Sequence, residues 1–213
     1  MLHDFFKTNA QSRFLSENEA RFPIPAWDRD RLPNRRWVLR HAKTHGVGVE
    51  IGVFRGQFSA LICEIAKPKE LYLVDPWTTL GETFGWGKEY TSFDRLTTLS
   101  ARQEAIARVA AFPEVTCHII EGSYPTCRDR LPEQLDWAYI DASHKYEPTL
   151  NELRSLDTSI APDGVIMGDD WSPNPDSQHH GVFLAVQQFV RESFWEIKAA
   201  GHGGQWVIRR RAN

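Results

Sequence analysis

The chain has 213 residues, of which 41% are hydrophobic and 25% are charged, and its formal net charge is -3. This length and composition are typical of one globular domain with a buried core. The slightly acidic balance argues against a nucleic-acid backbone as the main partner. No apolar run approaches the length of a membrane span, and the first residues lack a signal-peptide core. The sequence therefore predicts a cytoplasmic protein with no membrane partner.

The three cysteines are Cys63, Cys117 and Cys127, and their spacing matches no metal-binding motif. Cys63 and Cys117 lie in apolar segments, which predicts buried thiols in the reduced state. Reduced thiols indicate a reducing compartment, in agreement with the cytoplasmic prediction.

Residues 1–33 are punctuated by prolines and predict an N-terminal arm laid over the domain, with one or two short helices. The arm could serve as a lid or as a contact in a homodimer, and the sequence leaves both roles open. Asn34 is a candidate N-cap for a helix that runs to about His45. The main domain is therefore expected over residues 34–213.

The segment 47–59 reads VGVEIGVFRGQFS and combines a strand, a turn with glycines and the start of a helix. Its alternating apolar residues predict the strand, and the apolar residues from Phe58 onward recur at helical spacing. Glycines at such a turn allow the backbone to approach a ligand, and the helix N-terminus offers free N–H groups. The turn is therefore a candidate ligand site, although an ordinary turn between a strand and a helix would show the same pattern.

Strands and helices alternate through the rest of the chain. Strands are predicted at 71–74, 115–120, 135–140 and 164–168, helices at 101–111, after 141 and at 181–191, and two closing strands at 194–198 and 205–209. This order predicts an α/β fold with a mostly parallel sheet, helices on both faces and an antiparallel strand at one edge. The connection 77–99 is long and rich in aromatic residues, which indicates a packed loop or a binding surface.

Acidic residues stand at or near the ends of five successive predicted strands. They are Glu50, Asp75, Glu121, Asp141 and the pair Asp169 and Asp170. Ligands of open α/β sheets bind beyond these strand ends. Each residue alone could cap a helix or face solvent, but their joint placement predicts one site.

The glycines of the first turn distinguish between two kinds of nucleotide ligand. The dinucleotide fingerprint GxGxxG does not follow the strand, whereas the pattern ExGxxxG runs from Glu50 through Gly52 to Gly56. Asp75, at the end of the next strand, is placed to accept hydrogen bonds from both ribose hydroxyls of an adenosine. The sequence thus favours an adenosyl ligand over one with a pyrophosphate.

With these motifs the sequence resembles the class I S-adenosylmethionine-dependent methyltransferases. VEIGVFRG, LYLVDPW, IIEGS, LDWAYID and GVIMGDD look like successive motifs of these enzymes over residues 46–210. The segments IGVFRGQFS and DPW are most similar to the corresponding motifs of small bacterial-type methyltransferases, which are related to those that act on sugars of glycans and antibiotics. The resemblance implies a Rossmann-like sheet of seven strands and S-adenosyl-L-methionine as the cofactor. The residues that the resemblance implies as contacts of this cofactor are Glu50, Gly52, Phe54, Gly56, Asp75, Gly122, Ser123 and Asp141.

Asp141, Asp169 and Asp170 predict a metal site. Adjacent parallel strands lie about 4.8 Å apart, so carboxylates at neighbouring strand ends can share one hard cation such as Mg²⁺. Metal-dependent O-methyltransferases similar to catechol O-methyltransferase carry an Asp at the fourth strand end and an Asp-Asn or Asp-Asp pair after the fifth, and this sequence matches at all three positions. The ion would bind the acceptor hydroxyl and lower its pKa. Alternatively, the acidic cluster only neutralises the sulfonium and caps helices.

His144 falls where the catechol enzymes carry a catalytic lysine, so it is a candidate general base, and Lys145 is a neighbouring candidate. His179 and His180 lie in a later loop and could meet the substrate. We therefore expect a methyltransferase that methylates a hydroxyl group of a small acceptor, such as a sugar, a glycan or a natural product. A nicotinamide-dependent oxidoreductase, a metal-independent methyltransferase and a non-catalytic adenosyl-binding module are the alternatives.

Overall fold

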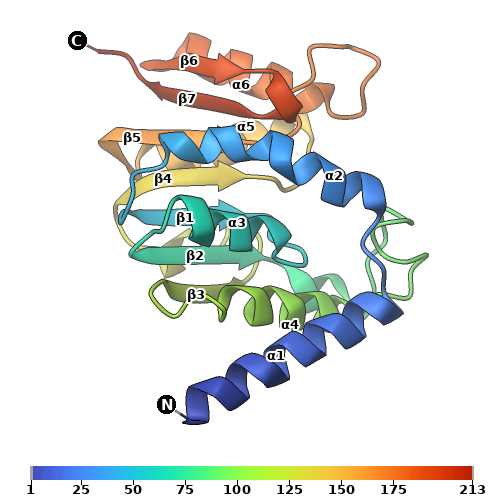
Figure 1. Cartoon of the computed structure of the whole chain (residues 1–213). Helices are drawn as coiled ribbons and strands as arrows, with labels where there is room; N and C mark the ends of the chain where they lie inside the picture. The colour runs from blue at the N-terminus through green and yellow to red at the C-terminus, as the bar shows by residue number, and fades with distance from the viewer. Residues whose placement is uncertain (1, 213) are drawn as a thin grey trace.

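Seven strands form one sheet in the order β3-β2-β1-β4-β5-β7-β6 (Figure 1). The computed structural model describes the backbone of residues 2–212 and the side chains of residues 10–212. The strands are β1 (Val47–Ile51), β2 (Glu70–Asp75), β3 (Thr116–Glu121), β4 (Leu135–Ile140), β5 (Ile160–Gly168), β6 (Trp195–Ala200) and β7 (Trp206–Arg210). The central strands β1 and β4 are almost entirely buried, as expected for a parallel sheet covered on both faces.

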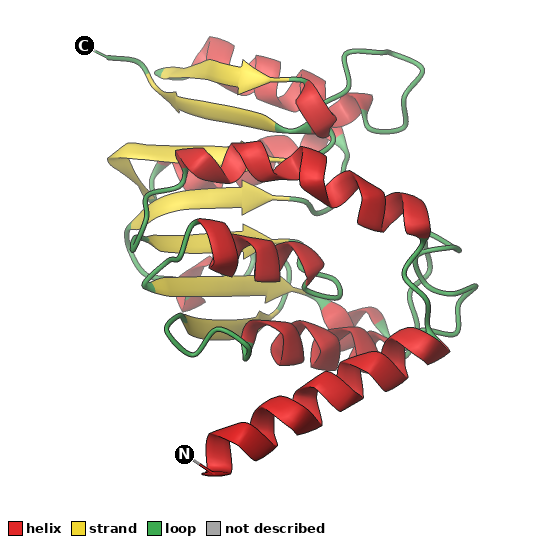
Figure 2. Cartoon of the chain, in the orientation of Figure 1, coloured by secondary structure: helices red, strands yellow, loops and turns green. Residues whose placement is uncertain are grey.

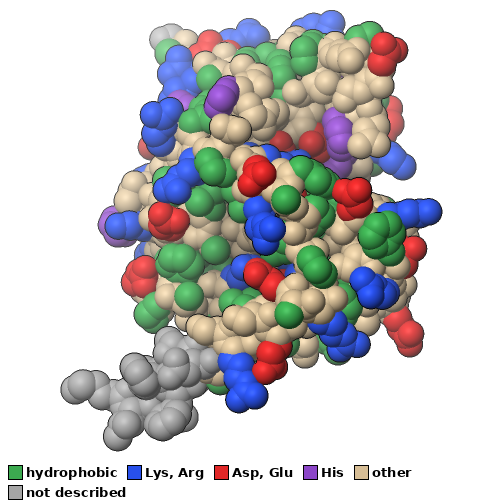
Figure 3. Space-filling model, turned by 45° about the vertical axis from the view of Figure 1, so that its right-hand side comes forward, with side chains coloured by type: hydrophobic (Ala, Val, Ile, Leu, Met, Phe, Trp, Pro, Cys, Tyr) green, Lys and Arg blue, Asp and Glu red, His purple; other side chains and the backbone are tan. Residues whose placement is uncertain are grey.

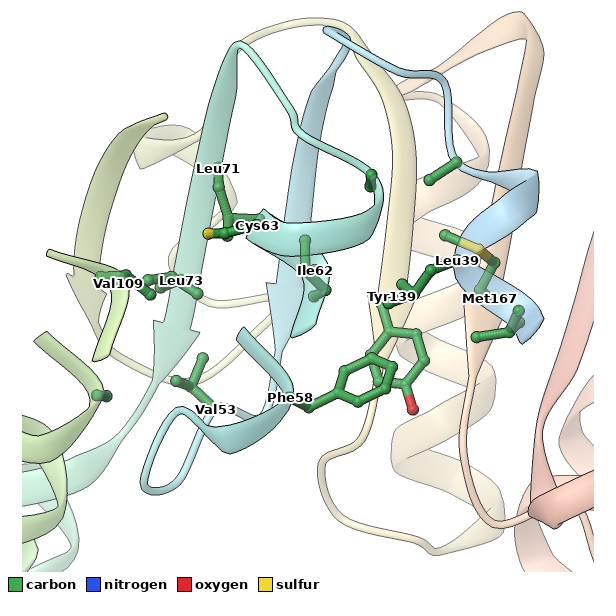
Figure 4. Packing of buried hydrophobic residues seen from close by; sticks show 14 of the residues in the cluster. Leu39, Val53, Phe58, Ile62, Cys63, Leu71, Leu73, Val109, Tyr139 and Met167 are labelled. Carbon is green, nitrogen blue, oxygen red and sulfur yellow. The ribbon is translucent and has the colours of Figure 1, made fainter. Parts of the chain in front are cut away.

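Helices cover both faces of this sheet (Figure 2). They are α1 (Leu2–Arg21), α2 (Ala26–Arg35), α3 (Gln57–Ile65), α4 (Thr98–Val109), α5 (Tyr146–Asp157) and α6 (His180–Glu192). One buried cluster joins α3 and α4 to the sheet, and a second joins α5 and α6 to its other face. Figure 4 shows the first cluster, in which the ring of Phe58 on α3 stacks on Tyr139 of β4 with 4.2 Å between ring centroids.

The topology confirms the predicted α/β class with its mostly parallel seven-stranded sheet. The strands β1 to β5 pair in parallel. The antiparallel strand is β7, and it pairs with β5 on one side and β6 on the other. It therefore lies one place inside the sheet, and β6 is the edge strand.

The predicted helix from Asn34 to His45 is wrong. Helix α2 starts earlier, at Ala26, and a 3-10 helix then covers Arg36–His41. Pro33 lies within α2, where it removes one backbone donor, and the chain tightens into the 3-10 helix soon after it. Because α2 runs across residues 33 and 34, the predicted division between arm and domain falls inside a helix and stays a prediction.

Helix α4 also begins before its predicted start at residue 101. Thr97 is its N-cap, and the Thr97 side-chain oxygen accepts a hydrogen bond from the Ser100 backbone N–H at 3.0 Å. This cap satisfies one of the free N–H groups of the first turn and so fixes the start of the helix.

The three cysteines are free, and Cys63 and Cys127 are buried while Cys117 is half-buried. The burial of Cys63 confirms the prediction, Cys117 is more exposed than predicted, and the reduced state stays a prediction. Among the described residues, every helix is too short or too polar to cross a lipid bilayer. The cytoplasmic location and the homodimer contact stay predictions.

Candidate functional site

A cavity of about 950 Å³ opens at the carboxyl ends of the parallel strands. Figure 3, turned so that this edge comes forward, shows a hollow with acidic side chains at its floor and histidine side chains beside it. Ten of the residues predicted for the site line this cavity: Glu50, Gly52, Phe54, Asp75, Gly122, Ser123, Asp141, His144, Lys145 and Asp170. Gly56 and Asp169 do not line it, and Glu121 turns away to accept a hydrogen bond from the Thr78 backbone N–H at 2.9 Å.

The glycine turn, residues 52–56 between β1 and α3, needs its glycines. Gly52 has φ +89°, and a Cβ atom there would lie 2.0 Å from the Asp141 carbonyl oxygen. Gly56 has φ +74°, and its Cβ would lie 2.6 Å from Cα of Ala105 on α4. Both positions combine a left-handed backbone with a close approach, which residues with side chains cannot accommodate.

The carboxylate of Asp75 holds this turn in shape. Its Oδ2 accepts hydrogen bonds from the backbone N–H groups of Val53 and Phe54, each at 2.9 Å, and its Oδ1 accepts one from Trp77 N–H at 2.9 Å. A carboxylate has about four acceptor positions, so roughly one remains for a ligand. The sequence predicted two ribose hydroxyls at Asp75, and the backbone contacts leave room for one.

Glu50 is buried beneath the turn and is 1% exposed. The Ser59 hydroxyl donates a hydrogen bond to its carboxyl group. Burial raises the pKa of Glu50 to about 8, because water no longer solvates the charged form. Glu50 therefore carries a proton at neutral pH and can act as a hydrogen-bond donor at the cavity wall.

Arg55, in the middle of the turn, makes an ion pair that the sequence did not predict. Its guanidinium donates to the Glu104 carboxylate at 2.8 and 2.9 Å and to the Phe22 carbonyl oxygen at 2.7 Å. Glu104, on α4, also accepts a hydrogen bond from the Asn18 side chain of α1 at 2.7 Å. The turn is thereby tied to the N-terminal helices. No sequence motif indicates this contact, because its partners lie far apart along the chain.

Two arginines of α2 reach the acidic strand ends. Arg35 Nη2 lies 2.6 Å from Asp141 Oδ2 and 3.0 Å from Asp169 Oδ2, and Arg31 also pairs with Asp169. The other Asp169 oxygen accepts a hydrogen bond from the Gln205 side chain. Burial opposes ionisation of Asp141, but Arg35 and His144 outweigh it and hold the Asp141 pKa below its usual range.

These contacts bear on the predicted Mg²⁺ site. A cation cage needs free carboxylate oxygens, and here the guanidinium groups occupy oxygens of Asp141 and Asp169. The three aspartates therefore do not fit a shared Mg²⁺ ion in this arrangement. Among the described residues, the group that brings potential ligand atoms within 4.8 Å of one another is instead His144, Asp170 and His179.

We call these three residues the polar centre. Asp170 Oδ2 lies 3.1 Å from His144 Nδ1 and 3.2 Å from His179 Nδ1, while His144 Nε2 lies 3.2 Å from Asp141 Oδ1. Burial alone would lower the pKa of His144, but Asp141 and Asp170 raise it to about 9. His180 points elsewhere, with its Nδ1 3.0 Å from the Ser172 carbonyl oxygen. Of the two loop histidines, His179 belongs to the site.

Five aromatic residues form one side of the cavity, which we call the aromatic wall: Trp27, Phe54, Phe84, Trp86 and Tyr90. The centroid of the Phe54 ring lies 5.1 Å from those of Phe84 and Trp86, and Trp27 meets Tyr90 edge-on at 4.7 Å. Trp77 does not belong to it, because its buried indole N–H donates to the Phe54 carbonyl oxygen at 2.8 Å. The aromatic connection is therefore partly core and partly cavity wall.

The comparisons with known proteins agree with this geometry. The family described as "Methyltransferase domain" matches residues 49–171. An uncharacterised protein of Acanthamoeba polyphaga mimivirus is 28% identical over 149 residues, which cover 68% of this chain and 59% of that protein. The chain thus spans less than two thirds of the length of this relative.

Solved structures share the fold. An SAH-bound methyltransferase from Podospora anserina superposes with a TM-score of 0.57 at 15% identity, covering 95% of this chain and 88% of that one. A proposed O-methyltransferase from Klebsiella pneumoniae gives a TM-score of 0.55 at 18% identity, covering 95% and 90%. The family match covers more than half of the chain, and the strand order is that of class I methyltransferases. This chain therefore belongs to the family of methyltransferase domains and has their Rossmann-like fold.

Proposed function

We propose that the chain binds S-adenosyl-L-methionine in the cavity and transfers its methyl group to a hydroxyl oxygen of a small acceptor. One observation carries the proposal. The glycine turn of the methyltransferase domain and the polar centre line the same cavity, so a cofactor and an acceptor can meet between them. The cavity has the size of sites that enclose small organic ligands.

The cofactor end of the proposal rests on the glycine turn and the next two strand ends. The remaining acceptor position of Asp75 is available to a ribose hydroxyl, and Gly122 and Ser123 line the cavity after β3, where the adenine would lie. Protonated Glu50 is available as a donor to the methionine part. The side chain of Phe54, within the turn, lines the cavity and is a candidate for a cation–π contact with the positive sulfonium.

The acceptor end of the proposal rests on the polar centre and the aromatic wall. Aromatic rings stack on the apolar faces of sugars and phenols, and the polar centre offers hydrogen-bond partners to a hydroxyl group. S-adenosyl-L-methionine supplies an already activated methyl group, so the protein must align the acceptor oxygen with it and take up a proton. A small molecule fits this enclosed arrangement better than a nucleic acid, in line with the net charge of -3.

His144 and Lys145 remain the proposed groups for removal of that proton. Because its pKa is raised to about 9, His144 holds a proton at neutral pH in the free protein. It can act as a base only after this proton has left. A reaction that uses His144 as its base should therefore accelerate as the pH rises towards about 9. Lys145 is exposed at the cavity rim, at the start of α5.

The test is a calorimetric titration of the protein with S-adenosylhomocysteine and, separately, with NAD. Binding of S-adenosylhomocysteine without binding of NAD supports the proposal, and the reverse result would indicate the oxidoreductase. Gly52→Ala should abolish binding, because the new Cβ would meet the Asp141 carbonyl oxygen. Gly85→Ala is the matched control, because a Cβ at residue 85 would have no atom within 4 Å other than those of its chain neighbours. Incubation with S-adenosyl-L-methionine and a panel of hydroxyl acceptors then separates an enzyme from a non-catalytic binding module.

A further inference from the structure

We propose that the polar centre of His144, Asp170 and His179 binds one divalent transition-metal ion, of the kind represented by Zn²⁺, Mn²⁺ and Co²⁺. The ion would sit at the acceptor end of the cavity, a placement that rests on the proposed function. This site differs from the one expected from the three aspartates, of which it retains only Asp170.

The first argument is the spacing of the ligand atoms. His144 Nδ1 and His179 Nδ1 lie 3.1 and 3.2 Å from Asp170 Oδ2. The potential ligand atoms of the three residues all lie within 4.8 Å of one another. Nitrogen and oxygen ligands about 2.0 to 2.2 Å from one ion are separated by about 3 to 3.5 Å in tetrahedral or octahedral sites. The group is therefore spaced for coordination with little rearrangement.

The second argument is that two of these atoms lack hydrogen bonds. Asp170 Oδ2 and His179 Nδ1 are buried and lie 3.2 Å apart as an ion pair, but neither makes a hydrogen bond of normal geometry with any side chain or backbone group that the structure describes. Buried polar atoms in proteins are nearly always paired, and an exception calls for an explanation such as a bound ion. An ion between the three side chains would satisfy both atoms at once.

The backbone supports the same placement. His144 has φ +59° and Asp170 has φ +65°, a left-handed conformation that residues with side chains seldom adopt. Such conformations concentrate at functional sites, where the surrounding structure enforces them. Here they occur in two of the three residues whose side chains meet.

The surroundings supply the outer contacts that metal-bound histidines require. The second nitrogen of His144, Nε2, lies 3.2 Å from Asp141 Oδ1, and Asp141 is in turn held by Arg35. A carboxylate on the second nitrogen orients a ligand histidine and fixes its tautomer. Asp141 would thus act as a positioning residue for His144, a role that its contact with Arg35 leaves open because the two partners use different carboxylate oxygens.

The ligand set indicates the class of ion. Two imidazole nitrogens and one carboxylate suit zinc, manganese, iron and cobalt, whereas magnesium and calcium prefer oxygen ligands. Three protein ligands leave coordination positions open towards the cavity, where an acceptor hydroxyl could bind and lose its proton more easily. In the ion-bound protein His144 would be a ligand and not the base, so the proton of the acceptor hydroxyl would pass to solvent water at the mouth of the cavity.

The test begins with protein treated with a chelator and then titrated with Zn²⁺, Mn²⁺ or Mg²⁺ by calorimetry. We expect one transition-metal ion per chain, bound at least tenfold more tightly than Mg²⁺. Co²⁺ binding should give visible absorption bands typical of nitrogen and oxygen ligands. Equal or tighter binding of Mg²⁺ would overturn the proposal and favour the three-aspartate site, as would loss of ion binding in Asp169→Asn with full binding in His179→Gln.

Matched variants sharpen this test. His179→Gln should weaken ion binding at least tenfold, whereas His180→Gln, the neighbouring histidine outside the group, should bind like the wild type. If His179→Gln does not fold, NMR of the wild-type protein gives the answer. Substoichiometric Mn²⁺ should broaden the ring signals of His144 and His179 before those of the distant His118, and equal broadening of all rings would contradict the proposal.

A titration of the chelator-treated protein with S-adenosylhomocysteine separates this inference from the proposed function. Binding of S-adenosylhomocysteine without any ion binding removes the metal proposal and keeps the cofactor proposal. Ion binding without S-adenosylhomocysteine binding keeps the metal site and removes the cofactor proposal.

Discussion

The guanidinium of Arg35, at the end of α2, lies 2.6 Å from the carboxylate of Asp141, at the end of β4. The same nitrogen is 3.0 Å from the Asp169 carboxylate, and the Arg35 side chain is 5% exposed. Helix α2, which runs across the predicted boundary between arm and domain, thus contributes the charge that balances two of the acidic strand ends. Arg31 of the predicted arm also pairs with Asp169, so both parts of the chain contribute to the site.

Replacement of Arg35 should lower the stability of the folded protein. Arg35→Met leaves Asp141 and Asp169 with too little compensating charge, so we expect a loss of about 3–5 kcal/mol in the free energy of unfolding. Arg36→Met is the control, because Arg36 pairs with Glu64 at the surface, where the two side chains are 49% and 56% exposed. It should cost less than about 1 kcal/mol. Urea unfolding measures both, and equal effects would contradict the assigned importance of the Arg35 contacts.

Gly56→Ala should destabilise the protein by about 1–3 kcal/mol more than Gly87→Ala. Both glycines have positive φ, at +74° and +62°, so both substitutions impose a similar backbone cost. Only the Cβ at residue 56 would meet backbone, at 2.6 Å from Cα of Ala105, whereas the Cβ at residue 87 makes an ordinary contact with Tyr90. Thermal or urea unfolding of the two variants isolates the steric part, and similar values would show that α3 and α4 can move apart freely.

Glu152 makes the stability of the protein depend on pH. Its side chain is 4% exposed, its Oε2 has no hydrogen-bond partner among residues 10–212, and burial raises its pKa to about 8. The folded state therefore binds more protons than the unfolded state between about pH 4.5 and 8, so stability falls as the pH rises through this window. Glu152→Gln should flatten this fall by up to about 1.4 kcal/mol per pH unit.

The corresponding measurement is urea unfolding at a series of pH values from 5 to 9. Glu50, with its pKa also raised to about 8, contributes a fall of the same sign that persists in the Glu152 variant. Glu147→Gln, at an exposed position of the same helix, is the control. A Glu152→Gln profile parallel to that of the wild type would show that Glu152 is not protonated in the folded protein.

Trp27→Ala should weaken binding of the acceptor and leave S-adenosylhomocysteine affinity within about twofold of the wild type. Trp27 is 45% exposed, lines the cavity from α2, and donates a hydrogen bond from its indole to Glu89 at 2.7 Å. An aromatic side chain in this position contributes stacking area to an acceptor. Phe194→Ala, 82% exposed and outside the cavity, is the control. An unchanged KM for the acceptor would remove the aromatic wall from the proposed acceptor site.

The sequence predicted the features that follow from local rules. Gly52 and Asp75 were found because strand ends and turns have their own residue preferences, and the order of strands and helices was enough to predict the sheet. The partners of the acidic residues were not predictable in this way. Arg35 and Asp141 are separated by 106 positions, and the sequence predicted a helix that begins at Asn34, whereas Arg35 is the last residue of α2.

The polar centre is a second example of contacts that local sequence rules do not predict. His179 was one of two adjacent histidines in a loop, and nothing in the local sequence distinguishes it from His180. Only the path of the chain between β5 and α6 brings His179 to Asp170 and turns His180 towards Ser172. Spacing along the sequence identifies metal ligands when they share a helix or a turn, but not when loops from two strand ends must meet.

The contacts of Arg55 define how much of the chain the cofactor turn requires. The family match begins at residue 49, yet the Arg55 guanidinium binds the carbonyl oxygen of Phe22, and its partner Glu104 binds Asn18. A fragment cut at the start of the matched region would leave this buried arginine without one of its acceptors, next to the turn itself. The smallest fragment able to present a correctly shaped turn therefore includes the N-terminal helices. Shortened variants made for screening or crystallisation should retain them.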